Sequence, residues 1–536
     1  MARHHIAATL VVSALAAPAL AHAGQIIIVN IDGPNEGFND PTPVAAIGGN
    51  PGTTRGQQRL NVFARAADIW EQALQPTNDI YVQASIDPLA ANVLGSAGAT
   101  FVFSDFPGAE FPSTWYPSAL ADQLAGAELN PGAPDIRARF SSNFNFYLGL
   151  DNNEGALTDL LPVVLHELGH GLGFANFVNE LDGTQLVGRA DVYSQYTLDV
   201  GTSKLWTAMT DLERRISAVH LRKVSWSGRQ VGLDVPSVLL PGEPYVGTPL
   251  GALMLGPASF GPALSGAGVT GDLVYVNDGV APTGDGCTTI AADLTGKIAL
   301  IDRGACTFVT KVKNAQRAGA IGVLVADNAA GGPPAGLGGV DATITIPSGR
   351  ITLADGNALK LALAGPVRVT LGLDFSVRAG TDRVRGLAMV AALDPVALGS
   401  SISHFEAVAF PNLLMEPAIN PDLRSSVSAP ADLTLSLMTD IGWFSDHDGV
   451  PDGADACLGS DPSASVVIAG CDSGVANTVF ADGCRITDQV DACLASAANH
   501  GQFVSCVAAL GTSLRARGLI SGAQRGALQS CAAHAN

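Results

Sequence analysis

Apolar and polar residues follow two different periods in the first part of the chain. Residues 25–31 form a short apolar run typical of a strand, whereas the apolar positions of residues 57–74 recur with helical spacing. Further runs typical of strands, separated by clusters of Gly and Pro, lie at residues 80–86, 100–103 and 136–148. A second helix is expected with Thr158 as its N-cap and the apolar run 163–165 in its first turns. This mixture predicts an α+β domain.

The composition changes at about residue 236, where Gly, Ala and Val become frequent and helical periodicity fades. The earlier pattern resumes near residue 378 and ends at Trp443-Phe444. We therefore expect one domain that is interrupted by a second, followed by a linker and a tail. The expected bounds are 24–235 and 375–444 for the interrupted domain, 236–374 for the insert, 445–470 for the linker and 471–536 for the tail.

The first 23 residues have the pattern of a cleaved secretory signal. A charged start precedes an apolar run at residues 6–17, and Ala21-His22-Ala23 provides the small residues of a cleavage site. The mature chain is expected to begin near Gly24. Every later apolar stretch is interrupted well short of the roughly 20 residues that a membrane-spanning helix needs. The sequence thus predicts a secreted protein, extracellular or periplasmic, without a membrane span.

Charge and cysteine content narrow the possible functions. The chain has 49 acidic and 29 basic residues, a net charge of -20, which argues against a nucleic-acid partner because phosphates are contacted mainly by Lys and Arg. All eight cysteines lie at or beyond Cys287, and in an oxidising compartment they are expected to form disulfides. The first half therefore has no thiol for a cysteine-protease mechanism.

The pentapeptide His166-Glu167-Leu168-Gly169-His170 carries the clearest chemistry. Histidines four residues apart share one face of a helix, so both can bind the same Zn²⁺ ion while the glutamate lies beside the open coordination position. Zinc acidifies a water molecule, and the carboxylate takes its proton and passes it to the leaving amine of a peptide. The alternative, a helix with two solvated histidines, is less consistent with the apolar run just before His166.

A catalytic zinc ion needs a third protein ligand, which the local sequence does not provide. In the pattern H-E-x-x-H-x-x-G-x-x-H, Gly173 fits, but the last position is Asn176, a poor zinc ligand. A carboxylate, Glu180 or Asp191, is one alternative. The remaining candidates are the histidines of the mature chain, His220, His404, His447, His500 and His534.

Four segments together resemble the leishmanolysin-type metzincins, a family of zinc endopeptidases. They are residues 166–174, 403–406, 413–417 and 433–443. In that family an insertion separates the second and third zinc histidines, and a methionine turn follows the third. The resemblance implies that His404 is the third ligand, that Met415 is the turn methionine, and that Gly173 lets the chain leave the helix.

The insert resembles a second family, the protease-associated (PA) domain. The similarity is carried by residues 296–308, by Asn314-Ala315-Gln316 and by Ala318-Gly319-Ala320, within a match of about 246–373. It implies a β-rich module able to bind a substrate or a partner protein. A folded domain with adjacent ends can sit in a loop at a small entropic cost, so His404 can return to the zinc site.

Residues 446–457 resemble the calcium-binding thrombospondin type 3 repeat, although Phe444 stands where the first Asp is expected. The candidate Ca²⁺ ligands are Asp446, Asp448, Val450, Asp452 and Asp455. The alternative is a solvated acidic linker. Six of the cysteines fall in the last 80 residues and suggest a disulfide-linked helical module.

Three smaller expectations concern side chains outside these motifs. Cys287 and Cys306 are expected to form a disulfide within the insert. Lys311 and Lys313 are expected on a solvated helix face. His220, in a basic segment, is expected to be a surface or packing histidine.

The sequence as a whole predicts an α+β, zincin-like domain interrupted by a β-rich PA domain. The predicted function is a secreted zinc endopeptidase that hydrolyses extracellular proteins or peptides. Two alternatives stay open. One is an extracellular binding or adhesion protein with a structural zinc ion, and the other is a zinc peptidase in which Glu180 is the third ligand. A purely structural zinc site normally has four protein ligands and no use for a carboxylate at Glu167.

Overall fold

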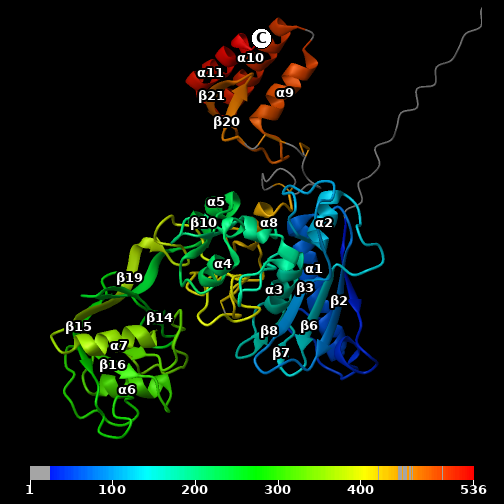
Figure 1. Cartoon of the computed structure of the whole chain (residues 1–536). Coiled ribbons are helices and arrows are strands. Elements are labelled where there is room, and N and C mark those ends of the chain that lie inside the picture. Colours follow the sequence, from blue (N-terminus) through cyan, green and yellow to red (C-terminus); the bar gives the residue numbers. More distant parts are fainter. Residues whose placement is uncertain are drawn as a thin grey trace, which may run out of the picture.

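The computed structural model describes residues 24–420, 422–444, 450, 456, 457, 460, 461, 463–497 and 499–535. The expected secretory signal at residues 1–23 lies outside these residues. Figure 1 shows the chain as a central body, an insert in green and yellow-green, and a tail in orange and red. Within the described part of the chain, no helix is long and apolar enough to cross a membrane.

The central body begins with a four-stranded sheet of order β1-β2-β6-β3, in which the first three strands are parallel and β3 is the antiparallel edge. The elements of this half are β1 (Ile26–Asn30), η1 (Gly37–Asn39), α1 (Arg55–Leu74), β2 (Ile80–Asp87), β3 (Gly95–Ala99), β4 (Val102–Phe103), β5 (Tyr116–Pro117), α2 (Ser118–Ala125), β6 (Ile136–Ser141), β7 (Phe146–Tyr147), β8 (Thr158–Asp159) and α3 (Leu160–Leu172). Helices α1 and α3 pack together, and the indole N–H of Trp70 donates to the Leu165 carbonyl at 3.1 Å.

Several expected elements differ in their bounds. The predicted strand at 136–148 divides into β6 and the short β7, and only residues 102 and 103 of the run 100–103 form a strand. The N-cap of α3 is Asp159 and not Thr158, because the Asp159 carboxylate accepts the Leu161 N–H at 3.0 Å. The C-cap of the helix is Gly173, whose φ of 131° is a backbone conformation that residues with a side chain rarely adopt.

The second half of the central body consists mostly of loops and short elements. They are η2 (Leu186–Gly188), η3 (Tyr193–Gln195), β9 (Thr197–Asp199), β10 (Lys204–Leu205), η4 (Trp206–Ala208), α4 (Asp211–Ser217), β11 (Val224–Trp226), α5 (Arg229–Val238) and α8 (Thr434–Asp440). The buried Asp440 carboxylate accepts N–H groups from Trp226, Gln230 and Val231 at 2.7–3.2 Å. The segments before and after the insert are thereby joined.

The insert is built on an eight-stranded mixed sheet of order β13-β12-β19-β15-β16-β17-β18-β14. Its elements are β12 (Pro241–Thr248), β13 (Gly251–Met254), β14 (Gly256–Pro257), β15 (Val269–Tyr275), β16 (Lys297–Asp302), α6 (Phe308–Arg317), β17 (Gly322–Ala326), β18 (Ser348–Ile351), α7 (Leu353–Ala362) and β19 (Arg368–Arg378). Its first and last strands pair antiparallel, with Pro241 opposite Arg378. The chain therefore enters and leaves the insert at one place, as the sequence argument requires.

Two expectations about the insert need correction. Residue 236 lies inside α5, whose Val235 and Val238 are buried in the central core, so the insert begins only at β12. Lys311 does not lie on a solvated face. It is fully buried, and its ammonium donates to the Asp285 carbonyl at 2.6 Å and lies 3.3 Å from Cys287 Sγ. The Lys313 side chain is 18 % exposed and pairs with Asp341.

Four disulfides are formed. Cys287–Cys306 in the insert is confirmed, and the tail contains Cys457–Cys484, Cys471–Cys531 and Cys493–Cys506. The tail elements are β20 (Ser465–Ile468), β21 (Cys471–Ala476), α9 (Ile486–Ser496), α10 (His500–Ala516) and α11 (Gly522–His534). Strands β20 and β21 form a hairpin, so the expected boundary between residues 470 and 471 falls inside this module.

Candidate metal centre

Helix α3 brings His166, Glu167 and His170 to one place. The residues around them in the helix are almost all buried, because Leu165, Leu168 and Leu172 pack into the central core. His166 and Glu167 are each 7 % exposed, and His170 is half-buried. The helix is therefore held on its apolar faces, and the two imidazoles lie on a common side.

His404, which follows the insert in the sequence, lies at the same place. Its carbonyl accepts the Ala391 N–H at 2.9 Å, and the next residue, Phe405, donates its N–H to the Met415 carbonyl at 2.7 Å. The Nε2 atoms of the three histidines form a triangle. Its sides are 3.1 Å (His166 to His170), 3.2 Å (His170 to His404) and 3.1 Å (His404 to His166).

The other ring nitrogens fix the tautomers. Nδ1 of His166, His170 and His404 lies 2.8, 2.7 and 3.0 Å from the carbonyls of Leu414, Phe174 and Ser400 respectively. Each Nδ1–H donates to its carbonyl, so each Nε2 presents a lone pair. Burial lowers the pKa of His166 to about 3 and that of His170 to about 4, and it lowers the pKa of His404 as well. All three rings are neutral at pH 7, as metal ligands must be.

The size of the triangle fits a zinc ion. A triangle with these sides has its centre about 1.8 Å from each corner, slightly less than the roughly 2.0–2.1 Å of a Zn–N bond. Three converging lone pairs repel each other unless a cation lies between them. The donor set and its spacing thus fit a metal ion held by three histidines.

Glu167, the residue after His166 on α3, lies against strand β3. Its carboxyl accepts the Ala97 N–H, and burial raises its pKa to about 8. Gly95 makes this approach possible, because a Cβ at that position would lie 2.8 Å from Glu167 Cγ. The edge strand is therefore in contact with the glutamate that the sequence marks as the base.

Met415, the predicted turn methionine, packs against α3 at Gly169. It is fully buried, and a Cβ on Gly169 would come within 2.9 Å of its sulfur. Leu414, the preceding residue, provides the carbonyl for His166. The segment that contains Met415 thus supports one of the three imidazoles directly.

The alternative ligands lie outside the triangle. The Glu180 carboxylate accepts the Asn176 amide at 3.0 Å, and the Asp191 carboxylate accepts the N–H groups of Phe177 and Ser194 at 2.9 and 2.7 Å. His220 Nδ1 lies 2.9 Å from Asp199, and its side chain is 38 % exposed. His447 lies outside the described residues, and His500 and His534 lie in the tail helices.

Asn176 and Ser403 were not expected from the sequence to contribute to the site. The Asn176 amide donates to Ser403 Oγ at 2.8 Å, next to His404. The only signal in the sequence was that Asn176 stands where a local third histidine is expected.

Two clusters of acidic residues, distinct from the three histidines, are also candidate metal sites. Four of the candidate calcium ligands, Asp446, Asp448, Asp452 and Asp455, lie outside the described residues, which include only Val450, so this site stays a prediction. The carboxylates of Asp122, Glu128 and Asp135 lie close together near the end of α2. Asp122 and Asp135 are buried and hydrogen-bond each other. Burial raises the pKa of both carboxyl groups, so a proton held between them accounts for their contact without a metal ion.

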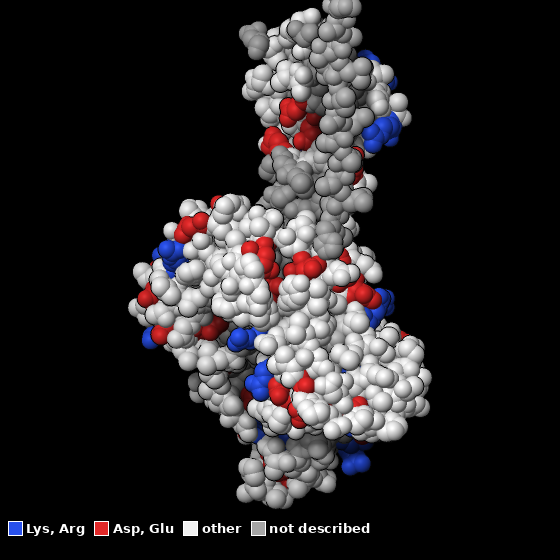
Figure 2. Space-filling view, turned by 90° about the vertical axis from the view of Figure 1, so that its right-hand side faces the viewer, with Lys and Arg blue, Asp and Glu red and all other residues white. Residues whose placement is uncertain are grey.

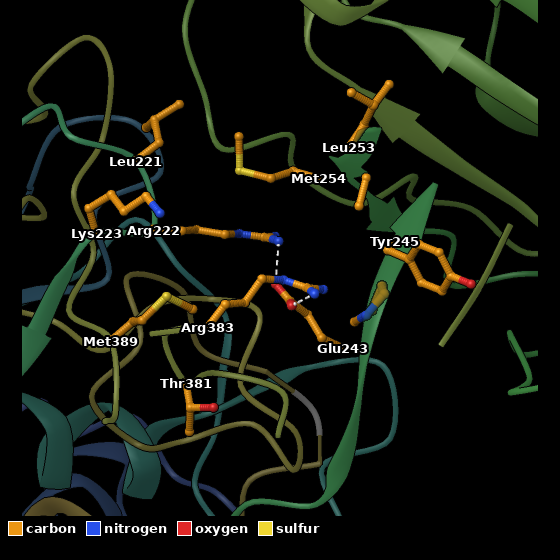
Figure 3. Close-up of a pocket in the computed structure, with 12 residues that line it drawn as sticks. Leu221, Arg222, Lys223, Glu243, Tyr245, Leu253, Met254, Thr381, Arg383 and Met389 are labelled. Carbon is orange, nitrogen blue, oxygen red and sulfur yellow. Dashed lines mark hydrogen bonds and ion pairs between the residues drawn. The ribbon is translucent and has the colours of Figure 1, made fainter. Parts of the chain in front are cut away.

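A cavity of about 230 Å³ lies away from the histidines, where the insert joins the central body. Figure 3 shows Arg222 and Arg383 on either side of the Glu243 carboxylate, with Met254 and Met389 nearby. Glu243 pairs with both guanidinium groups, at 2.9 and 2.5 Å. This cavity is part of the junction and not of the metal centre. On the face in Figure 2, the described Lys and Arg residues form small, separate groups.

Comparisons with known proteins concern only part of the chain. The family model of the PA domain matches residues 269–359. The probable leucine aminopeptidase 2 of Aspergillus fumigatus is 40% identical over 143 residues, which are 26% of this chain and 27% of that protein. The minor extracellular protease Vpr of Bacillus subtilis is 40% identical over 89 residues, 16% of this chain and 10% of that protein.

Among solved structures, BSAP, a zinc aminopeptidase from Bacillus subtilis, is 31% identical over 25% of this chain and 31% of that chain, with a TM-score of 0.20. A TM-score this low carries no argument on the fold of the whole chain. The chain spans about a quarter of the length of the first relative and a tenth of the second. What the comparisons establish is that the chain contains a PA domain at residues 269–359, which confirms that prediction.

Proposed function

We propose that this protein is an exported, zinc-dependent endopeptidase of the metzincin type. His166, His170 and His404 hold the zinc ion, and Glu167 is the general base. The observation that carries the proposal is the triangle of neutral Nε2 atoms, 3.1–3.2 Å apart, beside a carboxylate on the same helix. Met415 supports the site from below.

The chemistry of the site follows from this arrangement. A bound zinc ion supplies positive charge that acidifies water, polarises a peptide carbonyl and favours the ionised form of Glu167. The Nδ1–H groups of the histidines stay bonded to backbone carbonyls, so the rings keep one orientation. The Glu167 carboxylate takes a proton from the attacking water and delivers it to the leaving nitrogen. The Ala97 N–H holds the carboxylate in place while it does so.

Strand β3 supports a peptide as the substrate. It lies at the edge of the sheet and pairs with β6 on one side only, among the described residues. The Ala97 N–H points to Glu167, so the unpaired side of β3 borders the base. An extended peptide can pair with such an edge through its backbone, which places successive carbonyl groups along the site whatever their side chains.

The number of protein ligands distinguishes this proposal from a binding protein with a structural zinc ion. A structural site is normally closed by four protein ligands, whereas a catalytic one keeps an open position. Here three histidines converge and a carboxylate stands beside them. The PA domain, joined through β12 and β19, is available to hold a protein substrate or a partner.

The test uses the purified protein loaded with one equivalent of zinc. We expect it to cleave casein and also a fluorogenic peptide blocked at both ends, to lose this activity in a strong chelator, and to regain it with added Zn²⁺. Cleavage only of peptides with a free amino terminus would indicate an aminopeptidase instead. Stoichiometric zinc without any hydrolysis would favour the binding protein.

A further inference from the structure

A contact between Asn176 and Ser403 links the end of the zinc-motif helix to the segment that carries His404. The backbone N–H and the side-chain amide of Asn176 both donate to Ser403 Oγ, at 3.1 and 2.8 Å. The two residues are 227 positions apart, and Ser403 directly precedes His404. Asn176 itself stands six residues after His170, where a local third histidine would stand.

The Asn176 side chain is held in one orientation. Its Oδ1 accepts the Val178 N–H at 3.0 Å, and its amide also donates to Glu180 Oε1 at 3.0 Å. Glu180 is only 8 % exposed, so this acceptor is itself fixed in place. A flipped amide would lose its bonds to the Val178 N–H and the Glu180 carboxylate, since only the Ser403 hydroxyl can both donate and accept.

His404 depends on such contacts more than the other two histidines do. His166 and His170 are held by helix α3, whereas His404 lies in a loop. Its ring is bonded to the Ser400 carbonyl, which belongs to the same loop, and its carbonyl accepts the Ala391 N–H. The Asn176–Ser403 contact connects this loop to the residues that directly follow α3.

We propose that Asn176, acting through Ser403, is a positioning residue that sets His404 Nε2 at its distance from the other two ligands. This inference rests on the proposed function, because it assumes that the three histidines bind zinc. Asn176, which occupies the position of a local third histidine, thus holds the distant segment that provides His404 as the third ligand. Partners outside the immediate ligand set typically change metal affinity about 10- to 100-fold when they are lost.

The test compares zinc affinities, measured by competition with a chromogenic chelator, in the full chain. Ser403→Thr and Ser403→Val have the same shape and differ in the hydroxyl alone. We expect Ser403→Val and Asn176→Ala to bind zinc about tenfold more weakly than the parent, and Ser403→Thr to stay within about twofold of it. Asn179→Ala is the matched control, because Asn179 is exposed in the same loop and bonds only to its neighbours.

A double variant separates positioning from a general loss of structure. If the two residues act through one contact, Asn176→Ala combined with Ser403→Val should bind zinc no more weakly than the weaker single variant. The metal-free variants should also unfold at the temperature of the metal-free parent. Equal affinities of the Thr and Val variants, or additive losses in the double variant, would overturn the inference. Failure of the parent to bind one zinc ion would instead overturn the proposed function.

Discussion

The Nε2 atoms of His166 and His404 lie 3.1 Å apart although 238 residues separate them in the chain. The pairing of β12 with β19 makes this possible, because it closes the insert at its base. The insert adds a domain without moving the ends of the loop that contains it. The geometry of the metal centre therefore depends on how the short segments before β12 and after β19 pack together.

Replacement of His404 tests the ligand set. His404→Ala should leave two histidines, too few for tight Zn²⁺ binding, so we expect the zinc content of the purified protein to fall well below one equivalent and the activity with it. Zinc content is measured by atomic absorption on folded protein. His220→Ala should keep the metal, and a zinc-replete His404→Ala would exclude His404 as a ligand.

Replacement of Glu167 separates metal binding from catalysis. Glu167→Gln preserves the size of the side chain and the carbonyl that accepts the Ala97 N–H, so we expect one equivalent of zinc to remain. Hydrolysis should fall by about 10²- to 10⁴-fold, the usual contribution of a general base. Casein hydrolysis and metal analysis on the same sample provide the readout. Full activity in this variant would remove Glu167 from the mechanism.

The parts of this site that the sequence predicts are those with a local pattern. The spacing of His166 and His170 places both on one face of a helix, whatever the rest of the chain does. His404 and Met415 were expected only through the resemblance to a family. The Asn176–Ser403 contact could not be predicted, because two common polar residues 227 positions apart leave no periodicity in the sequence.

The incorrect expectations have physical causes of the same kind. Strand β3 was missed because Gly, Ser and Ala have low strand propensity, and its pairing with β6 stabilises it instead. Lys311 was expected in solvent because lysine rarely lies in a core. In the structure the segment around Asp285 covers it and provides a carbonyl acceptor. Both outcomes depend on neighbours that are distant in sequence.

Deletion of the tail tests whether the metal centre is independent of it. Among the described residues, none of the proposed zinc ligands or their hydrogen-bond partners lies beyond Phe444, and the tail has a core and three disulfides of its own. A chain that ends at Phe444 should therefore fold and bind one zinc ion with the affinity of the full chain. Chelator competition measures this. Loss of zinc from a truncated protein that is still folded would contradict the proposed division of the chain.

The last prediction concerns pH and the pair formed by Asp122 and Asp135. Burial raises the pKa of Asp122 to about 7 and also raises that of Asp135, whereas an unfolded Asp titrates near 3.9. Between about pH 4 and 7 the folded chain therefore binds more protons, so its free energy of unfolding falls as the pH rises and stays lower above pH 7. Asp122→Asn keeps an oxygen for the Leu129 N–H and a donor for Asp135. Its unfolding temperature should fall less than that of the parent between pH 5 and 8. At pH 8 its free energy of unfolding should exceed that of the parent by about 1 kcal/mol. An unchanged pH dependence in Asp122→Asn would show that the two carboxylates do not share a proton.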